Sequence, residues 1–355
     1  MTLLDKTIQS IDPLDHSLEE KMYRLWDNIA HPLGSLGVLE TLTSKIVAMT
    51  RDVNYVADKK AWCVMSADNG ICEEGVSVIP QSVTIQLVRN MLNGITAAAT
   101  MADFHHIDLK VVDCGLAGDV EDERLIRRKI AYGTRNFSKE PAMTREQAVQ
   151  ALEVGISLGD EWFSEGYKMI ATGELGIGNT STSSAVLSVL SGLGVDETCG
   201  LGSGLEPKMF ENKKIVIRRG IEINRPNSKD PVDVLAKVGG FDIAAMAGVF
   251  LSGAKNQIPV VVDGYISSVA ALLATRLAPH SVDYMIPSHL SKEPGAVYAM
   301  RELGLNPILD MGMRLGEGTG CPFAMQIVDV AFHVFRNMGT FDGAKIDGSG
   351  LIDIR

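Results

Sequence analysis

The chain has 355 residues, of which 46% are hydrophobic and 22% charged, a balance typical of a folded globular protein that excludes an intrinsically disordered chain. With 33 Lys and Arg against 44 Asp and Glu, the formal net charge is −11. This charge argues against nucleic acid or an anionic membrane as a general partner, because both need a basic face. Any anion must therefore bind at a local site.

The five cysteines are odd in number and show no Cys-x-x-Cys spacing, which favours free thiols in a reducing compartment. The segment Met1–Ser17 has no apolar stretch of the kind that a signal peptide needs. No apolar run reaches the length of about 18 residues that a membrane-spanning helix needs. We therefore expect a cytoplasmic protein with no membrane partner.

Short apolar runs alternate with longer helical patterns along most of the chain. The expected strands are Ala61–Ser66, Leu109–Cys114, Lys168–Thr172, Pro259–Val262, Asp283–Ile286 and Pro307–Asp310. The expected helices include Val83–Phe104, Arg145–Glu165, Thr182–Leu190, Val269–Leu277 and Phe323–Arg336. Buried strands that alternate with helices predict an α/β fold with a parallel sheet and flanking helices.

The two ends of the chain have a different pattern. Residues 1–55 contain helical patterns without a convincing strand, and residues 321–355 contain one expected helix. We expect these two segments to pack together as a small helical domain beside a catalytic domain of residues 56–320.

Glycines and polar residues follow the expected strands, at the sheet edge where open α/β folds bind ligands. Gly173–Ser184 is rich in glycine and then in hydroxyl groups, and its backbone N–H groups could bind a phosphate at a helix N-terminus. A glycine turn with a Ser or Thr cap is the simpler interpretation of this loop alone. The segment lacks the Gly-Lys-Ser/Thr of a Walker A motif, and its glycine spacing is wrong for a dinucleotide fingerprint.

A second glycine loop, Gly200–Gly204, precedes Lys213 and Lys214, and one of these lysines could add a positive charge to an anion site. A solvated helix that carries lysines explains the same pattern. No histidine or cysteine cluster has metal-ligand spacing, so we expect no metal and no cofactor. Cys321 is better explained as a buried thiol than as a nucleophile.

Two glutamates share similar flanks. Glu174 follows a glycine and precedes a leucine, and Glu317 lies between two glycines after Leu315. Desolvation in such a setting raises the pKa of a carboxyl group toward the range of a general base. An exposed loop position is the usual alternative for a glutamate. The repeated setting at strand ends favours function, with the leucines as apolar walls for a flat ring.

The chain resembles the nicotinate-nucleotide–dimethylbenzimidazole phosphoribosyltransferases, which build the lower-ligand nucleotide of cobalamin. The resemblance runs from Gly34–Gly37 to the C-terminal helix. Its motifs are Gly173–Thr180, Gly239–Gly248, Asp263-Gly264, Pro287–His289 with Ser291, Glu293 and Gly295, Leu303–Leu305, Asp310 and Arg314–Gly320.

The resemblance implies a pentosyltransferase that moves ribose 5-phosphate from nicotinate mononucleotide to 5,6-dimethylbenzimidazole. The products would be α-ribazole 5′-phosphate and nicotinate. Glu317 matches the family's catalytic glutamate and would be the general base, and Glu174 would stabilise the oxocarbenium-like transition state. The implied fold is a Rossmann-like α/β domain with a small helical domain, and the implied assembly is a homodimer.

The resemblance also implies the substrate-binding residues. The phosphate would lie on Gly176, Gly178, Gly202, Ser203 and Lys213, and Leu175, Leu315 and Gln86 would line the base pocket. The expected set is completed by Asn179, Thr180, Asp263 and Ser291.

Several positions depart from the family pattern and leave the acceptor base open. They are His31 and Leu33 before the first glycine motif, Asn69 in place of a histidine, Leu201 in place of an arginine, and Cys321 in place of an alanine. A related branch transfers the same group to phenol or cresol as a heterodimer of two such chains. A non-catalytic partner subunit and a nicotinamide-dependent oxidoreductase are further alternatives. The retained Glu317 argues against the first, and the glycine spacing argues against the second.

Overall fold

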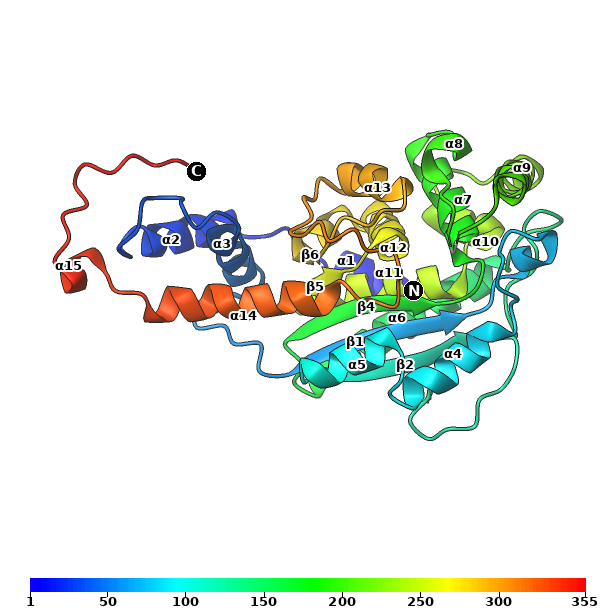
Figure 1. Ribbon diagram of the computed structural model, residues 1–355, viewed down its shortest axis with the longest axis horizontal. Helices are drawn as coiled ribbons and strands as arrows, with labels where there is room; N and C mark the ends of the chain where they lie inside the picture. The colour runs from blue at the N-terminus through cyan, green and yellow to red at the C-terminus, as the bar shows by residue number, and fades with distance from the viewer. Residues whose placement is uncertain (203) are drawn as a thin grey trace.

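The computed structural model describes residues 1–202 and 204–355, which form one six-stranded sheet. Neighbouring strands pair in parallel in the order β3-β2-β1-β4-β5-β6 (Figure 1). The strands are β1 (Lys60–Ala67), β2 (Asp108–Gly115), β3 (Ile126–Arg127), β4 (Met169–Leu175), β5 (Val260–Val262) and β6 (Met285–Pro287). The predicted α/β fold with a parallel sheet is confirmed.

Some strands differ from the prediction in their bounds or in whether they form at all. Strand β4 continues to Leu175, so Glu174 lies in the strand and not in the loop. The prediction of a strand at Pro307–Asp310 is wrong, because this segment forms only an isolated bridge between Leu309 and His289, beyond the end of β6. The two-residue strand β3 was not predicted, since its pattern is too short to recognise.

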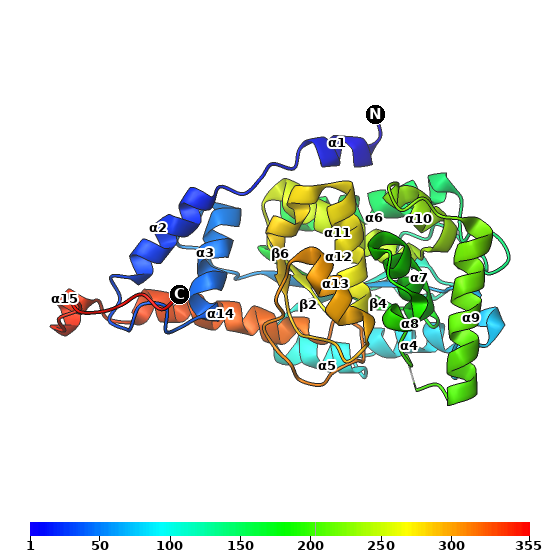
Figure 2. The same ribbon diagram turned by 90° about the horizontal axis from the view of Figure 1, so that it is seen from above.

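Helices cover both faces of the sheet (Figure 2). One face carries α4 (Val83–Leu92), α5 (Ala97–Phe104) and α14 (Cys321–Asn337). The other carries α11 (Phe241–Asn256) and α12 (Tyr265–Leu277), with α6 (Arg145–Ser164) packed on α11. The single helix predicted over 83–104 is divided into α4 and α5, because Gly94 after α4 has a left-handed backbone with φ +78°.

The remaining helices lie around the carboxyl ends of the strands or at the ends of the chain. They are α1 (Leu3–Gln9), α2 (His16–Trp26), α3 (Val38–Thr50), α7 (Asn179–Ser191), α8 (Val195–Thr198), α9 (Pro207–Asn224), α10 (Pro231–Val238), α13 (Gly295–Leu303) and α15 (Phe341–Ala344). A short 3₁₀ helix at Gly70–Glu74 follows β1, and another at Pro279–Tyr284 directly precedes β6.

The two chain ends meet beside the sheet. Helix α3 packs on α2 and on α14, Ile29 forms a β-bridge with Thr340, and the rings of Trp26 and Phe335 lie 5.1 Å apart (Figure 1). Helix α1 lies apart from this group, against α6 and α11 (Figure 2). We propose that α2, α3 and the outer part of α14 form the small helical domain. Across the described residues, no helix is long and apolar enough to cross a membrane.

Candidate functional site

A cavity of about 370 Å³ lies at the carboxyl edge of the sheet. The segments after β1, β4, β5 and β6 converge on it, together with the start of α7 and the glycine loop before α14. The predicted site residues that line it are Glu174, Leu175, Gly176, Gly178, Asn179, Thr180, Gly202, Lys213, Asp263, Ser291, Leu315 and Glu317. The structure therefore brings together side chains from five separate parts of the sequence.

Two predicted residues do not join this lining. Gln86 is exposed on α4, where its amide Nε2 donates a hydrogen bond of 2.9 Å to Asn90 Oδ1. The helical turn directs the next residue, Leu87, to the cavity instead. Ser203 lies outside the described residues.

Glu317 lies in the loop Gly316–Gly320 with a left-handed backbone, φ +60°, which is unusual for a residue with a side chain. Its Oε2 accepts a hydrogen bond of 3.4 Å from the N–H of Ala98, in the first turn of α5. Burial raises the pKa of Glu317, the Ala98 N–H partly opposes this shift, and Asp263 adds to it. Among the described residues, the Ala98 N–H is the one donor to this carboxylate, and together with the raised pKa this suits it to accept a proton from a bound ligand.

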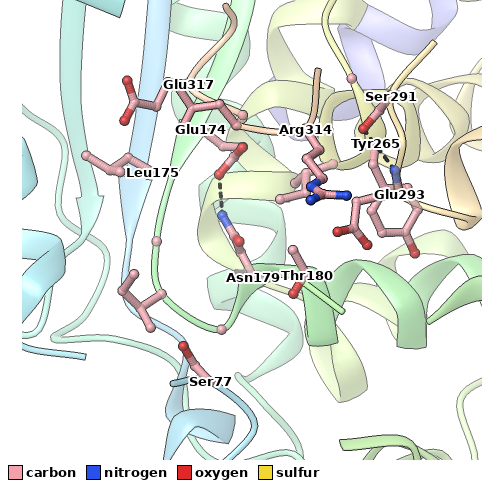
Figure 3. Close-up of a pocket in the computed structure, with 18 of the residues that line it drawn as sticks. Ser77, Glu174, Leu175, Asn179, Thr180, Tyr265, Ser291, Glu293, Arg314 and Glu317 are labelled. Atoms are coloured by element: carbon pink, nitrogen blue, oxygen red, sulfur yellow. Dashed lines mark hydrogen bonds between the residues drawn. The ribbon is translucent and has the colours of Figure 1, made fainter. Parts of the chain in front are cut away.

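Glu174 lies near the end of β4, and its Oε2 accepts a hydrogen bond from Asn179 Nδ2 (Figure 3). Burial raises the pKa of Glu174 well above its usual value, and the nearby carboxylates of Asp242 and Asp263 raise it further. The hydrogen bond from Asn179 opposes the shift without overcoming it. The raised pKa favours the neutral form of Glu174, which can donate a hydrogen bond.

The end of the cavity away from Glu317 carries groups that bind an anion, and we call it the anion end. Gly178, with φ +93°, begins α7, a helix of 13 residues, so the positive end of the helix dipole opens on the cavity. The buried ammonium of Lys213 donates hydrogen bonds to Thr180 Oγ1 at 2.8 Å and to the Gly200 carbonyl at 3.1 Å. Burial lowers the pKa of Lys213. A bound anion would offset this cost of burying the charge.

Several lining residues were not assigned a role from the sequence. Figure 3 places Glu317 and Leu175 on one side of Glu174, and Arg314 and Glu293 on the other. Arg314 was noticed only as part of a motif, although its guanidinium points into the anion end beside Glu293 (Figure 3). His289 is also buried in the lining, and its Nε2 lies 3.4 Å from Asp263 Oδ1. The sequence motifs contain both Arg314 and His289, but their place in the same cavity depends on the fold and not on local sequence.

The wall near Leu175 is apolar. It consists of side chains from the segment after β1, from α4, from the end of β4 and from the loop before α14, namely Val76, Ile79, Leu87, Leu175, Ile177 and Leu315. Ser77 adds one hydroxyl to this wall (Figure 3). Leu315 is 60% exposed at the cavity, which leaves its apolar side chain available to contact a ligand ring.

Comparisons with known proteins identify the family. A family model described as "Phosphoribosyltransferase" matches residues 11–346. A nicotinate-nucleotide–dimethylbenzimidazole phosphoribosyltransferase from Clostridium tetani (strain Massachusetts / E88) is 47% identical and covers 100% of this chain and 98% of the relative. A relative of the same name from Clostridium acetobutylicum is 46% identical over 97% of this chain and 98% of its own length.

The chain belongs to the nicotinate-nucleotide–dimethylbenzimidazole phosphoribosyltransferase family. It is thus a pentosyltransferase by family, as the resemblance predicted. A crystal structure of CobT from Thermus thermophilus has a TM-score of 0.89 and 34% identity, and covers 94% of this chain and 100% of that chain. The family's fold is thus also the fold of this chain.

The residues that depart from the family pattern lie in different parts of the structure, some near the cavity and some far from it. Asn69 is buried beneath the anion end, where its Oδ1 accepts a hydrogen bond of 2.9 Å from Thr182 Oγ1 in α7. His31 is buried at the helical end of the molecule, with Nε2 3.1 Å from Glu40 Oε1. Leu201 is 47% exposed, one residue before the lining residue Gly202. The Cys321 thiol is buried and burial raises its pKa well above the usual value, which disfavours a thiolate nucleophile.

Among the described residues, no group of three or more His, Cys, Asp or Glu side chains is arranged to hold a metal ion.

Proposed function

We propose that the chain transfers ribose 5-phosphate from nicotinate mononucleotide to 5,6-dimethylbenzimidazole, giving α-ribazole 5′-phosphate and nicotinate. One observation carries the proposal: a single cavity joins an apolar end that holds Glu317 to an anion end that holds Lys213 and the N-terminus of α7. The first end suits a flat aromatic acceptor and the second suits the phosphate of the donor.

In this reaction the acceptor nitrogen without a hydrogen attacks C1′ of the ribose. The bond between C1′ and the pyridinium nitrogen breaks, and its electron pair stays on nicotinate, which leaves without needing an acid. The proton on the other acceptor nitrogen passes to Glu317. Attack opposite the leaving group inverts the β-nucleotide to an α-product.

Glu317 is the proposed general base, supported by its burial, its raised pKa and its place beside the apolar wall. Positioned proton removal contributes about 10²–10⁴-fold to a rate. The cavity adds to this by holding both substrates in register, which removes much of the entropic cost of their encounter.

Glu174 contributes differently from the expectation of a second negative charge. Its raised pKa favours the protonated form, and its place between the two ends of the cavity suits a hydrogen bond to the ribose. We assign it this hydrogen-bonding role in the reaction (Figure 3).

The donor phosphate is proposed to lie on the backbone of Gly176, Gly178 and Gly202, with Lys213 as the buried counter-charge. Asn179, Thr180, Asp263 and Ser291 would complete the donor site. Arg314 adds a second cation at the same end, which the sequence motif alone did not assign (Figure 3).

We also propose that the chain acts as a homodimer in the cytoplasm. Free thiols at all five cysteines support a reducing compartment, and strongly exposed apolar side chains such as Phe104, at 77%, support a partner surface. Light scattering of the purified chain should give twice the monomer mass, and a monomer that gains mass only with a paralogous chain would indicate a heterodimer.

The activity is tested by incubating the protein with nicotinate mononucleotide and one acceptor at a time. The panel contains 5,6-dimethylbenzimidazole, benzimidazole, adenine, phenol and p-cresol, and chromatography measures both nicotinate and the new nucleotide. We expect equal amounts of both products, formed fastest with 5,6-dimethylbenzimidazole. Faster transfer to phenol or cresol would support the phenol-specific branch, and no nicotinate with any acceptor would refute the function.

A further inference from the structure

The indole of Trp62 contacts the loop that carries the proposed base. Trp62 lies in β1, is fully buried, and its Nε1–H donates a hydrogen bond of 2.9 Å to the backbone carbonyl of Glu317. The two residues are 255 positions apart in the sequence. This is a direct link between the rigid centre of the sheet and the Glu317 backbone.

The loop packs closely against the indole and against β4. A Cβ added to Gly318 would lie 2.1 Å from Trp62 Nε1, and one added to Gly173 would lie 2.5 Å from the Glu317 carbonyl oxygen. Three successive residues, Gly316, Glu317 and Gly318, have left-handed φ values of +88°, +60° and +83°. Such a conformation at a glutamate is strained and persists only where its surroundings hold it.

We propose that Trp62 is a positioning residue for the reaction: its indole N–H holds the Glu317 backbone in the left-handed conformation that directs the carboxylate into the cavity. The proposal rests on the proposed function of Glu317 as the base. Trp62 does not line the cavity, so it acts through Glu317 and not on the substrate.

Other contacts hold the loop on both sides of the Glu317 carbonyl. Asp263 Oδ1 accepts the N–H of Gly320 at 2.7 Å, and Thr319 Oγ1 donates to the Gly316 carbonyl at 2.8 Å. The indole is the side chain that reaches the Glu317 carbonyl itself. Loss of its N–H should therefore free the Glu317 carbonyl, while these contacts and the hydrogen bond of 3.0 Å from the Cys321 N–H to the Gly318 carbonyl remain.

The test is Trp62→Phe, which keeps a buried aromatic ring and removes the donor. A displacement of about 1 Å in a catalytic group can cost about 10²-fold, so we expect kcat to fall about 10- to 100-fold with KM for nicotinate mononucleotide changed less than about 3-fold. The matched control is Trp26→Phe, since Trp26 is equally buried and its indole donates 2.8 Å to Thr43 Oγ1, in the helical part of the molecule. The control should lower the melting temperature without lowering kcat.

The pH profile separates positioning from simple loss of folded protein. A freed loop exposes the Glu317 carboxyl to water, so the acid side of the kcat/KM profile of Trp62→Phe should move to lower pH. A smaller fraction of folded protein would lower kcat/KM equally at every pH, and the pH at which the profile falls would stay the same. Wild-type kcat in Trp62→Phe, or an equal fall in the Trp26→Phe control, would overturn the proposal.

Gly318→Ala provides a second variant in case Trp62→Phe does not fold. Its new methyl group meets Nε1 and should break the hydrogen bond while the indole remains. With three tryptophans in the chain, ¹⁵N-indole spectra contain three resonances, and we expect only that of Trp62 to move upfield in this variant. An unmoved Trp62 resonance would overturn the contact. The spectrum tests the contact without any measurement of activity. It therefore remains informative even if the wild-type protein does not transfer the group.

Discussion

Two regions of the cavity carry a glutamate with nearly the same local sequence and different environments. The strand end Gly173–Leu175 holds Glu174, and the loop Gly316–Gly320 holds Glu317; both side chains belong to residues that are 7% exposed. Glu174 has Asp242, Asp263 and Glu317 as carboxylate neighbours, and Asn179 as a hydrogen-bond donor. For Glu317, the nearby Asp263 carboxylate raises the pKa further, and the Ala98 N–H supplies a hydrogen bond that lowers it.

The difference teaches that exposure does not decide the role of a buried carboxyl group. Burial raises both pKa values, and the additional negative neighbours of Glu174 raise its pKa further. We propose that Glu317 is the group that takes a proton from the acceptor. We therefore propose a hydrogen-bonding role for Glu174 and a base role for Glu317, because environments that separate two pKa values favour different roles.

The largest effect should come from Glu317→Gln. The amide keeps the size of the side chain but cannot accept a proton, so kcat should fall about 10²–10⁴-fold, the usual contribution of a general base. Circular dichroism should show an unchanged fold. Retention of more than a tenth of wild-type turnover would remove the distinction between the two glutamates.

Lys213→Met tests whether the anion end works independently of both glutamates. A hydrogen bond to a charged group is worth about 1.5–3 kcal/mol, so KM for nicotinate mononucleotide should rise about 10- to 150-fold. KM for the benzimidazole should stay close to its wild-type value. Steady-state kinetics with each substrate varied in turn measures both constants, and an equal rise in the two would contradict a phosphate-specific role.

Glu174→Gln should have the smallest effect of the three substitutions. If Glu174 is protonated, the amide replaces one neutral hydrogen-bonding group by another, and the loss should stay within about tenfold, the value of a neutral hydrogen bond. The measurement is kcat beside that of Glu317→Gln. A loss as large as that of Glu317→Gln would show that Glu174 acts as an anion.

Much of the fold could be predicted because the central strands are continuous apolar runs. Strands β1 and β2 extend the predicted runs by one residue at each end. The segment Pro307–Asp310 has a similar composition but pairs at one residue only, a distinction that depends on where β6 ends and not on its own sequence. The break at Gly94 was missed because apolar spacing continues across it from α4 to α5.

The site could be predicted where glycine motifs mark a special backbone. The Glu317 and Gly176–Gly178 segments carry such motifs, and they line the cavity. Trp62 could not be found in this way, because a tryptophan within an apolar strand has the pattern of a core residue and its partner is 255 positions away. Gln86 was placed from resemblance, and the rotation of α4 turns it outward.

The pH dependence of kcat/KM, measured in parallel for the wild type and Glu317→Gln, tests the central claim most directly. Glu317 must be deprotonated to act, so the wild-type value should fall as the pH drops through its raised pKa, at a higher pH than an ordinary glutamate would allow. The variant should be slow and lack this fall, while titration of the donor phosphate affects both proteins equally. The same acid-side fall in both proteins, at comparable rates, would contradict Glu317 as the base.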